Sequence, residues 1–175
     1  MISHKAVFSK PKNPSYSCLA DLIETVLPEL DDTDKAILRR LQQDARISFK
    51  EIAKEVGTSE ATVFVRVKKL QKNGVIKAFR AIVNPESVGK QVTAFALVRA
   101  EPRSYPKVLA QLQTFDDVCE VYDVTGAYYS IIKMRASTSE QLAKVLDKIG
   151  EIEGIVGTET VIVLRTIKEE TEIKF

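Results

Sequence analysis

The chain has few of the residues on which most catalytic and metal-binding sites depend. Its 175 residues include two cysteines and one histidine. Cys18 and Cys119 lie too far apart in the sequence to form the closely spaced ligands of a zinc site, and a cysteine–histidine nucleophile pair would have to recruit His4 near the N-terminus. Two isolated cysteines are typical of reduced thiols, which predicts a cytoplasmic location. We therefore expect no catalytic residues and no metal ion.

Glycine-rich loops and long apolar runs are also missing. The seven glycines stand singly, so neither common phosphate-binding loop is present and no cofactor is expected. The longest stretch without a charged residue, Val124 to Ile132, is far shorter than the roughly 18 residues of a membrane-spanning helix. Residues 1–9 lack the continuous apolar core of a secretory signal. With 45% apolar and 29% charged residues, the composition predicts a soluble protein with one globular domain or two small ones.

Charge is distributed unevenly along the chain. The net charge is only +2, but residues 31–84 contain 12 Lys and Arg against 7 Asp and Glu, whereas residues 91–175 contain 10 against 13. A basic first half and a mildly acidic second half are expected when only the first half binds a polyanion such as DNA.

Three short helices are predicted between Leu30 and Gly74. Each begins with a side chain that can cap its first turn: Asp31, Ser48 and Ser59. Gly57 ends the second helix and Gly74 the third. The apolar positions of each segment fall on one face: Ile37, Leu38, Leu41, Ile52, Ala53, Val56, Val63, Val67 and Leu70. Helix, glycine turn and helix define a helix-turn-helix unit, whose last helix enters the DNA major groove.

The outward face of the third helix is the predicted DNA-binding surface. Together with the two capping serines it supplies the candidate contacts: Ser48, Ser59, Ala61, Thr62, Phe64, Val65, Arg66, Lys68 and Lys69. Phe64 and Val65 either pack against a neighbouring element or contact thymine methyl groups. Lys68 and Lys69 either form a solvated face or, with Arg66, bind phosphates. Residues 75–83 alternate loosely, which predicts a connecting strand or wing.

From Gln91 onward, strand-like and helix-like segments alternate. Strands are expected at 92–98, 118–124, 128–134 and 161–167, and helices at 105–115 and after a Ser139 cap. The order βαββαβ is the ferredoxin-like split unit, so the fold class is α+β. The predicted domains are an N-terminal extension (1–29), the helix-turn-helix (30–80), a connecting strand or hinge (81–90) and the βαββαβ domain (91–175). In the extension, apolar residues between Leu19 and Leu27 recur at helical spacing and predict one apolar helix face. The sequence does not identify the element against which this face packs.

A series of motifs runs through the first half: Leu30-Asp31-Asp32-Thr33-Asp34, Ile37-Leu38, Asp44-Ala45-Arg46-Ile47-Ser48, Ile52-Ala53, Val56-Gly57-Thr58-Ser59, Val67-Lys68-Lys69-Leu70 and Gly74-Val75-Ile76. These motifs resemble the leucine-responsive and asparagine-operon regulators, the Lrp/AsnC family, and the resemblance continues to Phe175. It implies a transcriptional regulator that binds double-stranded DNA. It also implies a second domain that forms dimers, and an octamer or another ring of dimers, and that binds an amino acid between subunits.

The resemblance further implies the residues of an effector site: Val124, Thr125, Gly126, Ala127, Tyr128, Tyr129, Thr158 and Thr160. Many family members have an acidic residue where this chain has Tyr129, and tyrosine does not supply that carboxylate at neutral pH. Gly126 is present either only because the turn requires a positive φ or because it contacts the ligand. The two threonines are either ordinary strand residues or face the loop across a subunit contact.

These observations favour a sequence-specific transcriptional regulator, dimeric or larger, whose DNA affinity is modulated by an amino acid or a related small metabolite. A weakly selective architectural DNA-binding protein without an effector is the alternative, and a DNA footprint separates the two. A metabolic enzyme with a regulatory ligand domain is a third hypothesis, which the chain does not support because it has no catalytic constellation. No membrane partner is expected.

Overall fold

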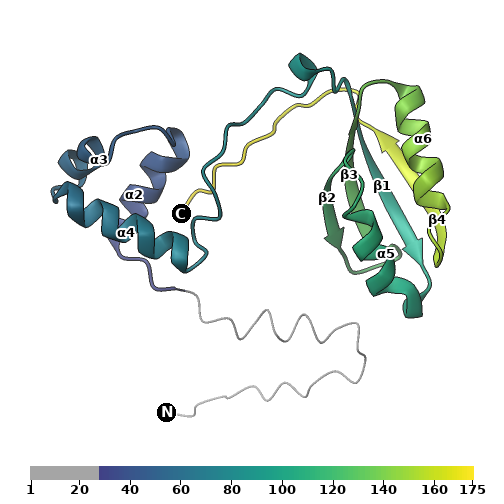
Figure 1. Ribbon diagram of the computed structural model, residues 1–175, viewed down its shortest axis with the longest axis horizontal. Coiled ribbons are helices and arrows are strands. Elements are labelled where there is room, and N and C mark those ends of the chain that lie inside the picture. The colour runs from purple at the N-terminus through teal and green to yellow at the C-terminus, as the bar shows by residue number, and fades with distance from the viewer. Residues whose placement is uncertain (1–27) are drawn as a thin grey trace, which may run out of the picture. The chain divides into compact units, whose positions relative to one another are not determined.

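The computed structural model describes residues 28–175, which form two compact units (Figure 1). The first unit contains the described residues up to Arg80 together with residues 172–175, and the second contains residues 81–171. Residues 172–175, which were expected in the second domain, belong to the first unit. The apolar stripe between Leu19 and Leu27 lies outside the described residues.

The first unit consists of the three expected helices: α2 (Asp32–Gln43), α3 (Phe49–Val56) and α4 (Glu60–Lys72). All three predicted caps are confirmed. The Asp31 carboxylate accepts the backbone N–H of Asp34 at 2.7 Å, and Ser59 accepts that of Thr62 at 3.1 Å. Ser48 forms a reciprocal capping box with the third residue of α3. These contacts satisfy N–H groups that lack partners within each first turn, which is why the helices begin where the sequence predicts.

The core of this unit is built from the predicted apolar faces. Its buried members come from all three helices: Ile37, Leu41, Ile52, Ala53, Val63 and Val67. Ile37, Ile52 and Val63 are completely buried. Burying a side chain of this size stabilises a fold by about 1.5 to 3 kcal/mol relative to leaving it in water. The core therefore holds α4 in place from its inner side and leaves its outer side to solvent.

The strand or wing predicted at residues 75–83 is not formed, and this prediction is wrong for the described chain. Residues 77–83 have irregular backbone, and Phe79, Ile82 and Val83 are exposed. A β-strand needs a neighbour that accepts and donates its backbone hydrogen bonds. No described segment of this chain pairs with residues 75–83.

The second unit is a four-stranded sheet with two helices. Its elements follow the predicted βαββαβ order: β1 (Val92–Ala100), α5 (Tyr105–Leu112), β2 (Val118–Asp123), β3 (Ser130–Ala136), α6 (Ser139–Gly150) and β4 (Ile155–Ile162). Short 3₁₀ turns, η2 (Glu86–Val88) and η3 (Pro102–Ser104), precede β1 and α5. The strand order is β2-β3-β1-β4 with antiparallel pairing throughout. This is the ferredoxin-like arrangement that the sequence predicts.

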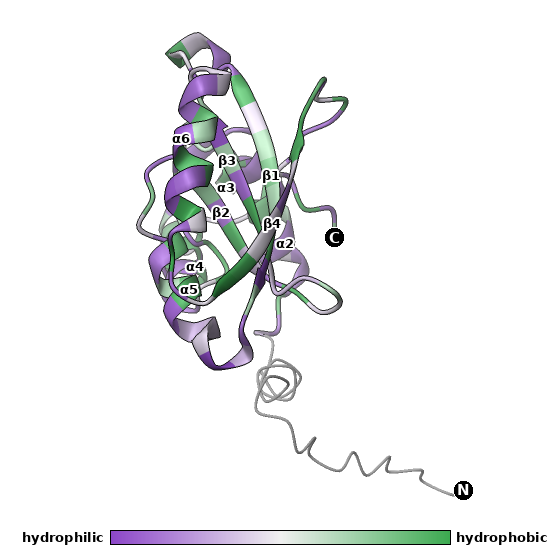
Figure 2. Ribbon diagram, turned by 90° about the vertical axis from the view of Figure 1, so that its right-hand side faces the viewer, coloured by the Kyte–Doolittle hydropathy of each residue, from purple (hydrophilic) through white to green (hydrophobic). Residues whose placement is uncertain are grey.

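One face of the sheet carries both helices and the main core (Figure 2). Ala94, Ala96 and Val98 of β1 are completely buried there, as their alternation predicts. The helices contribute five buried residues: Val108, Leu112, Leu142, Val145 and Ile149. The opposite face of the sheet has no helix of this unit over it, and we refer to it as the open face.

Several predicted boundaries in this unit are wrong by a few residues. Helix α5 ends at Leu112 instead of Phe115, and Thr138, not Ser139, caps α6 by accepting the Gln141 N–H at 3.1 Å. Strand β3 starts two residues later than expected. The strand expected at residues 161–167 is wrong by more, because β4 spans Ile155–Ile162 and shares only Val161 and Ile162 with the expected range. Pairing with β1 decides where β4 lies, and that pairing is invisible in local periodicity.

The predicted hinge, residues 81–90, contains η2 and is anchored at its end. Lys90 Nζ lies 2.5 Å from a carboxylate oxygen of Asp117, and the Gln141 side chain donates to the other oxygen at 3.0 Å. These two donors lower the pKa of Asp117. The start of β1 is thereby tied to the turn before β2 and to α6.

Candidate DNA-binding surface and effector loop

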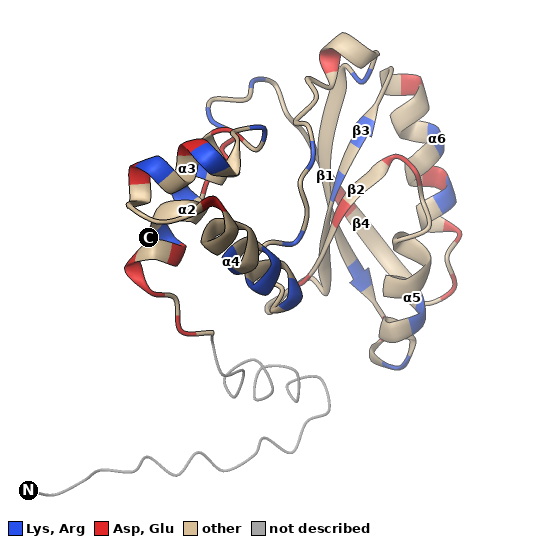
Figure 3. Ribbon diagram, turned by 60° about the vertical axis from the view of Figure 1, so that its left-hand side comes forward, with Lys and Arg blue, Asp and Glu red and all other residues tan. Residues whose placement is uncertain are grey.

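The outer side of α4 places most of the predicted DNA contacts in solvent. Ala61, Phe64, Val65, Lys68 and Lys69 are exposed and lie opposite the buried stripe of the same helix. Phe64 has 49% and Val65 64% of its surface exposed. Lys68 and Lys69, with Lys72 beyond them, give the second half of α4 a run of positive charge (Figure 3). A helix with this surface can offer apolar groups to base edges and cations to phosphates.

The two predicted serines occupy helix N-termini. Ser59 Oγ accepts the Thr62 N–H and lies 2.8 Å from Thr62 Oγ1, so Ser59 and Thr62 form one cap on α4. Ser48 caps α3 with its hydroxyl in contact with the carboxylate of Glu51, whose pKa is lowered by that hydrogen bond. Exposed helix N-termini attract phosphate through their free N–H groups and the helix dipole. Contact of these serines with DNA stays a prediction.

Phe64 has features of both interpretations that the sequence left open. Its ring meets Phe49 of α3 edge-on, with centroids 6.2 Å apart and planes inclined by 60°. Lys68 Nζ lies 5.7 Å from the ring centroid. These contacts hold one edge of the ring while about half of its surface stays exposed. Phe64 therefore packs against the start of α3 and can still present an apolar surface outward.

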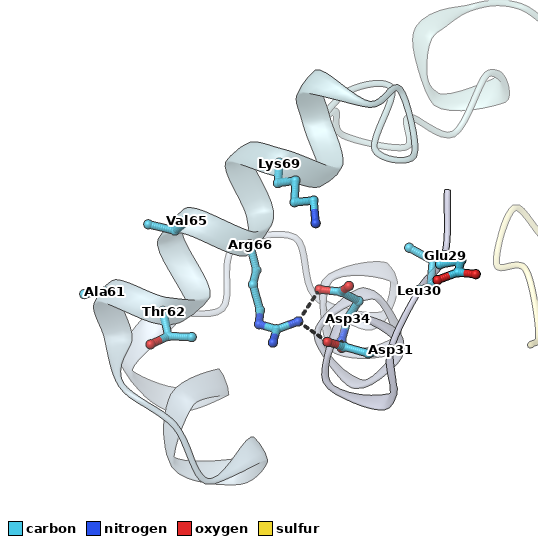
Figure 4. A pocket seen from close by; sticks show the side chains of 9 residues that line it. All are labelled: Glu29, Leu30, Asp31, Asp34, Ala61, Thr62, Val65, Arg66 and Lys69. Atoms are coloured by element: carbon cyan, nitrogen blue, oxygen red, sulfur yellow. Dashed lines mark hydrogen bonds and ion pairs between the residues drawn. The ribbon is translucent and has the colours of Figure 1, made fainter. Parts of the chain in front are cut away.

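Arg66 lies differently from the other cations of α4. Its Nη1 is 2.6 Å from the Asp31 carboxylate and 2.9 Å from that of Asp34, both at the start of α2 (Figure 4). Hydrogen bonds from the guanidinium to the two carboxylates raise the pKa of Arg66, and the pKa of Asp31 is lowered by the Asp34 N–H and then by Arg66. Sequence reasoning missed this cluster because Arg66 lies more than 30 residues from both aspartates.

An open hollow surrounds this cluster between α4 and the start of α2. Arg66 and Lys69 point into it, while Val65 points away (Figure 4). Nine residues line it: Glu29, Leu30, Asp31, Asp34, Ala61, Thr62, Val65, Arg66 and Lys69. The hollow therefore shares five residues with the predicted DNA-binding surface.

In the second unit, the predicted effector loop, residues 124–129, is closed by one backbone hydrogen bond between its ends and is joined to β1 by another. The Val124 N–H donates to the Tyr129 carbonyl at 3.0 Å, and the Tyr129 N–H donates to the Val98 carbonyl at 2.8 Å. Gly126 has a φ of +118°, which side-chain-bearing residues rarely adopt. Gly126 thus meets the requirement of the turn, and Thr125, Gly126 and Ala127 are exposed at its tip.

The two tyrosines of the loop have different environments. The Tyr128 hydroxyl donates to the Glu159 carboxylate, and this hydrogen bond raises the pKa of Tyr128. Arg99 lies 5.8 Å from the centroid of the same ring. Tyr129 instead stacks on Tyr105, the first residue of α5, and burial raises the pKa of Tyr129. Sequence reasoning did not identify Arg99, Tyr105 or Glu159, since each comes from an element distant in the chain.

The structure places the two threonines of the predicted effector set on β4, separated from the loop by β1. Thr158 pairs with Val98 across the β1–β4 ladder, and Val98 also accepts the Tyr129 N–H. Thr158 and the loop therefore lie on opposite sides of one β1 residue. Thr160 pairs with Ala96, two residues further along β1. Thr158 is exposed and Thr160 is partly buried.

Two family models match the chain, one for each unit. Residues 30–77 match a winged helix-turn-helix DNA-binding model, and residues 93–173 match the Lrp/AsnC ligand binding domain. Among residues 28–175, no helix combines the length and apolar character needed to cross a membrane. Within the same residues, no three His, Cys, Asp or Glu side chains are grouped so as to hold a metal ion.

Named proteins are similar over most of the chain. The HTH-type transcriptional regulator FL11 of Pyrococcus furiosus is 43% identical over 144 residues, covering 82% of this chain and 95% of FL11. The structure of Escherichia coli AsnC has a TM-score of 0.78 and 36% identity, over 82% of this chain and 98% of AsnC. The feast or famine regulatory protein of M. tuberculosis, complexed with L-methionine, has a TM-score of 0.74 and 28% identity, over 83% of this chain and 99% of that structure.

A helix-turn-helix unit followed by a ferredoxin-like ligand-binding unit defines a DNA-binding transcriptional regulator. Within that class, the chain belongs to the Lrp/AsnC family. The resemblance inferred from the sequence motifs is thereby confirmed, as are the fold class and the regulatory function.

Proposed function

We propose that this regulator recognises specific DNA sites with the outer face of α4 and that an amino acid bound at the loop 124–129 modulates its DNA affinity. The DNA-binding part of this proposal rests on the exposed face of α4. This face combines Val65 with Lys68 and Lys69 on a helix with a well-formed N-terminal cap. Lysines suit phosphates, and an apolar side chain suits thymine methyl groups. Ala61, Thr62 and Phe64 complete the surface that faces the bases.

The effector half rests on the ligand-binding family model and on the geometry of the loop. One structural relative is a complex with L-methionine, an amino acid whose carboxylate needs N–H donors and whose ammonium needs acceptors. The exposed backbone of Thr125, Gly126 and Ala127 provides a place for the carboxylate. Tyr129 provides a hydroxyl group within the loop. Thr158 and Thr160 lie one strand away on β4 and would add hydroxyl groups to the loop of a second copy.

We further propose that two copies cover each other's open face. Partner positions in the sheet ladder share a face, so four apolar side chains lie there together: Phe95, Leu97, Ile131 and Val161. Val161 is 48% exposed in the single chain. A dimer would place two copies of α4 on one DNA molecule, and rings of dimers would extend that arrangement. An effector that binds one assembly better than another would then shift DNA affinity.

Lysine variants test the DNA surface. Lys68→Ala and Lys69→Ala should each weaken binding to all duplex sequences about equally and reduce the slope of log affinity against log salt by about 0.9 for each phosphate that the lysine no longer neutralises. Lys144→Ala, an exposed lysine of α6, is the matched control and should leave both quantities unchanged. Unchanged affinity and slope in both α4 variants would contradict the proposal.

A footprint distinguishes specific recognition from architectural binding. Protection limited to two half-sites about one helical turn apart is expected, whereas continuous protection that ignores sequence would indicate an architectural protein. For the effector, a survey of thermal unfolding with each amino acid should identify ligands that raise the unfolding temperature. If none does, the second unit serves assembly alone.

A further inference from the structure

Arg66 joins α4 to the first turn of α2 through one nitrogen and two carboxylates. Nη1 contacts Oδ2 of Asp31 at 2.6 Å and Oδ1 of Asp34 at 2.9 Å. The other oxygen of Asp31, Oδ1, accepts the backbone N–H of Asp34 at 2.7 Å. Asp31 therefore caps α2 with one oxygen and binds α4 with the other. The contact links the position of α4 directly to the start of α2.

Burial makes this contact difficult to give up. Asp34 is only 8% exposed as a residue. Burying a carboxylate costs free energy because the group loses its hydration, and attraction to a nearby cation offsets that cost. If the cation is removed, the cost remains and the attraction is lost. Arg66 itself lies one position before buried Val67 and three after buried Val63, and 30% of its side chain is exposed. Its charge is already balanced by two carboxylates, whereas Lys68 and Lys69 form no ion pair within residues 28–175.

We infer that Arg66 is a positioning residue, which sets the placement of α4 for DNA binding and contacts neither phosphate nor base. This inference rests on the proposed DNA-binding role of α4 and differs from the sequence-based expectation, in which Arg66 contacts DNA. Nη1 of Arg66 is shared by both carboxylates, so the guanidinium offers a polyanion a charge that is already neutralised. If Arg66 moved to a phosphate instead, two unpaired carboxylates would be left beside the polyanion. Lys68 and Lys69 carry no such constraint.

Salt dependence separates positioning from phosphate contact. In the full chain, Arg66→Ala should lower DNA affinity severalfold at a temperature where circular dichroism shows the variant folded, with the salt slope equal to that of the wild type. Lys68→Ala is the charge-matched control and should reduce the slope by about 0.9. A slope reduced equally by Arg66→Ala would overturn the inference, because it identifies Arg66 as a phosphate ligand. Unchanged affinity in the folded variant would also overturn it, because Arg66 would then contribute to stability alone.

The acidic partner provides an independent test with a nearly isosteric change. Asp34→Asn and Asp32→Asn each remove one negative charge from the first turn of α2, but the Asp32 side chain is fully exposed and lies 3.8 Å from Lys35 instead of binding Arg66. If Arg66 positions α4, Asp34→Asn should bind DNA more weakly than Asp32→Asn. If Arg66 instead contacts phosphate and the carboxylates compete for it, Asp34→Asn should bind DNA more tightly than Asp32→Asn. That result would overturn the inference.

Failure of the proposed function gives a different result. If α4 is not the DNA-binding element, Lys68→Ala and Lys69→Ala will not affect DNA binding, whatever Arg66→Ala does. If α4 binds DNA and only the inference is wrong, the lysine variants will still lower the salt slope. The two failures are therefore distinguishable in one set of measurements.

Discussion

Tyr129, in the loop 124–129 proposed to bind the effector, stacks on Tyr105 of α5, with ring centroids 3.2 Å apart and ring planes inclined by 21°. The loop is thereby held against the helical side of the second unit. Burial and the nearby Asp123 raise the pKa of Tyr129, so its hydroxyl is neutral at physiological pH. A site that includes Tyr129 offers a phenol where many family members offer a carboxylate.

This relationship predicts the effect of Tyr129→Asp on effector binding. A carboxylate binds an ammonium more strongly than a phenol does, by about 1.5 kcal/mol, so affinity for ordinary α-amino acids should rise about tenfold. Calorimetry on the full chain measures the change. Gln111→Asp adds the same charge at an exposed position of α5 and should have no effect. Absence of binding to both the wild type and Tyr129→Asp would contradict the sensor role.

Val65 gives a prediction about base recognition. Each thymine methyl buried against Val65 should contribute about 0.8 kcal/mol, so uracil in place of a contacted thymine should weaken binding about fourfold. In Val65→Ala, the same uracil substitution should have a much smaller effect. Because Val65 is 64% exposed, Val65→Ala should leave the unfolding temperature nearly unchanged. Equal uracil effects in both proteins would show that Val65 does not contact the methyl group.

The open face of the sheet predicts the assembly state. Leu97 lies at the centre of this face, between Ile131 of β3 and Glu159 of β4. Leu97→Lys should convert a dimer or larger assembly into a monomer at micromolar concentration, because it replaces an apolar contact by a charged amine, and even pairing with Glu159 would require an ion pair to be buried in the interface. Light scattering on the full chain measures this, with Ala143→Lys on the exposed side of α6 as the control. A monomeric wild type would rule out the proposed interface.

Acid stability should depend on Asp117. Lys90 and Gln141 hold the pKa of Asp117 below its ordinary value in the folded state, so the folded protein binds the proton less readily than the unfolded chain. The resulting stabilisation is complete above about pH 5 and is lost as the pH falls below about 4. Asp117→Asn should cost about 1 kcal/mol at neutral pH, since Lys90 is partly exposed.

Denaturant unfolding at several pH values tests this prediction. The difference between the wild type and Asp117→Asn should shrink below about pH 4. Asp116→Asn, a change at the neighbouring residue, should show no such difference. If the difference in unfolding free energy between the two proteins is the same at every pH, the stability lost in Asp117→Asn comes from packing and not from the charge of Asp117.

Local chemistry explains which parts of the fold were predictable. The caps at Asp31, Ser48 and Ser59 each involve a residue three positions ahead, so the signal lies within one helical turn. The alternation of β1 identified the face that packs against the helices. The predicted β4 was displaced because residues 161–167, which include the apolar run Val161 to Leu164, look like a strand, although β1 pairs with residues 155–162.

The sequence by itself determined the three capped helices, the βαββαβ order and the motifs that indicate the Lrp/AsnC family, because these depend on residues that are neighbours in the chain. Only the tertiary structure decided that Arg66 binds Asp31 and Asp34, and that Tyr129 stacks on Tyr105. Each of these contacts joins residues at least 24 positions apart. Their distance and direction follow from helix packing and strand pairing, which local periodicity does not contain.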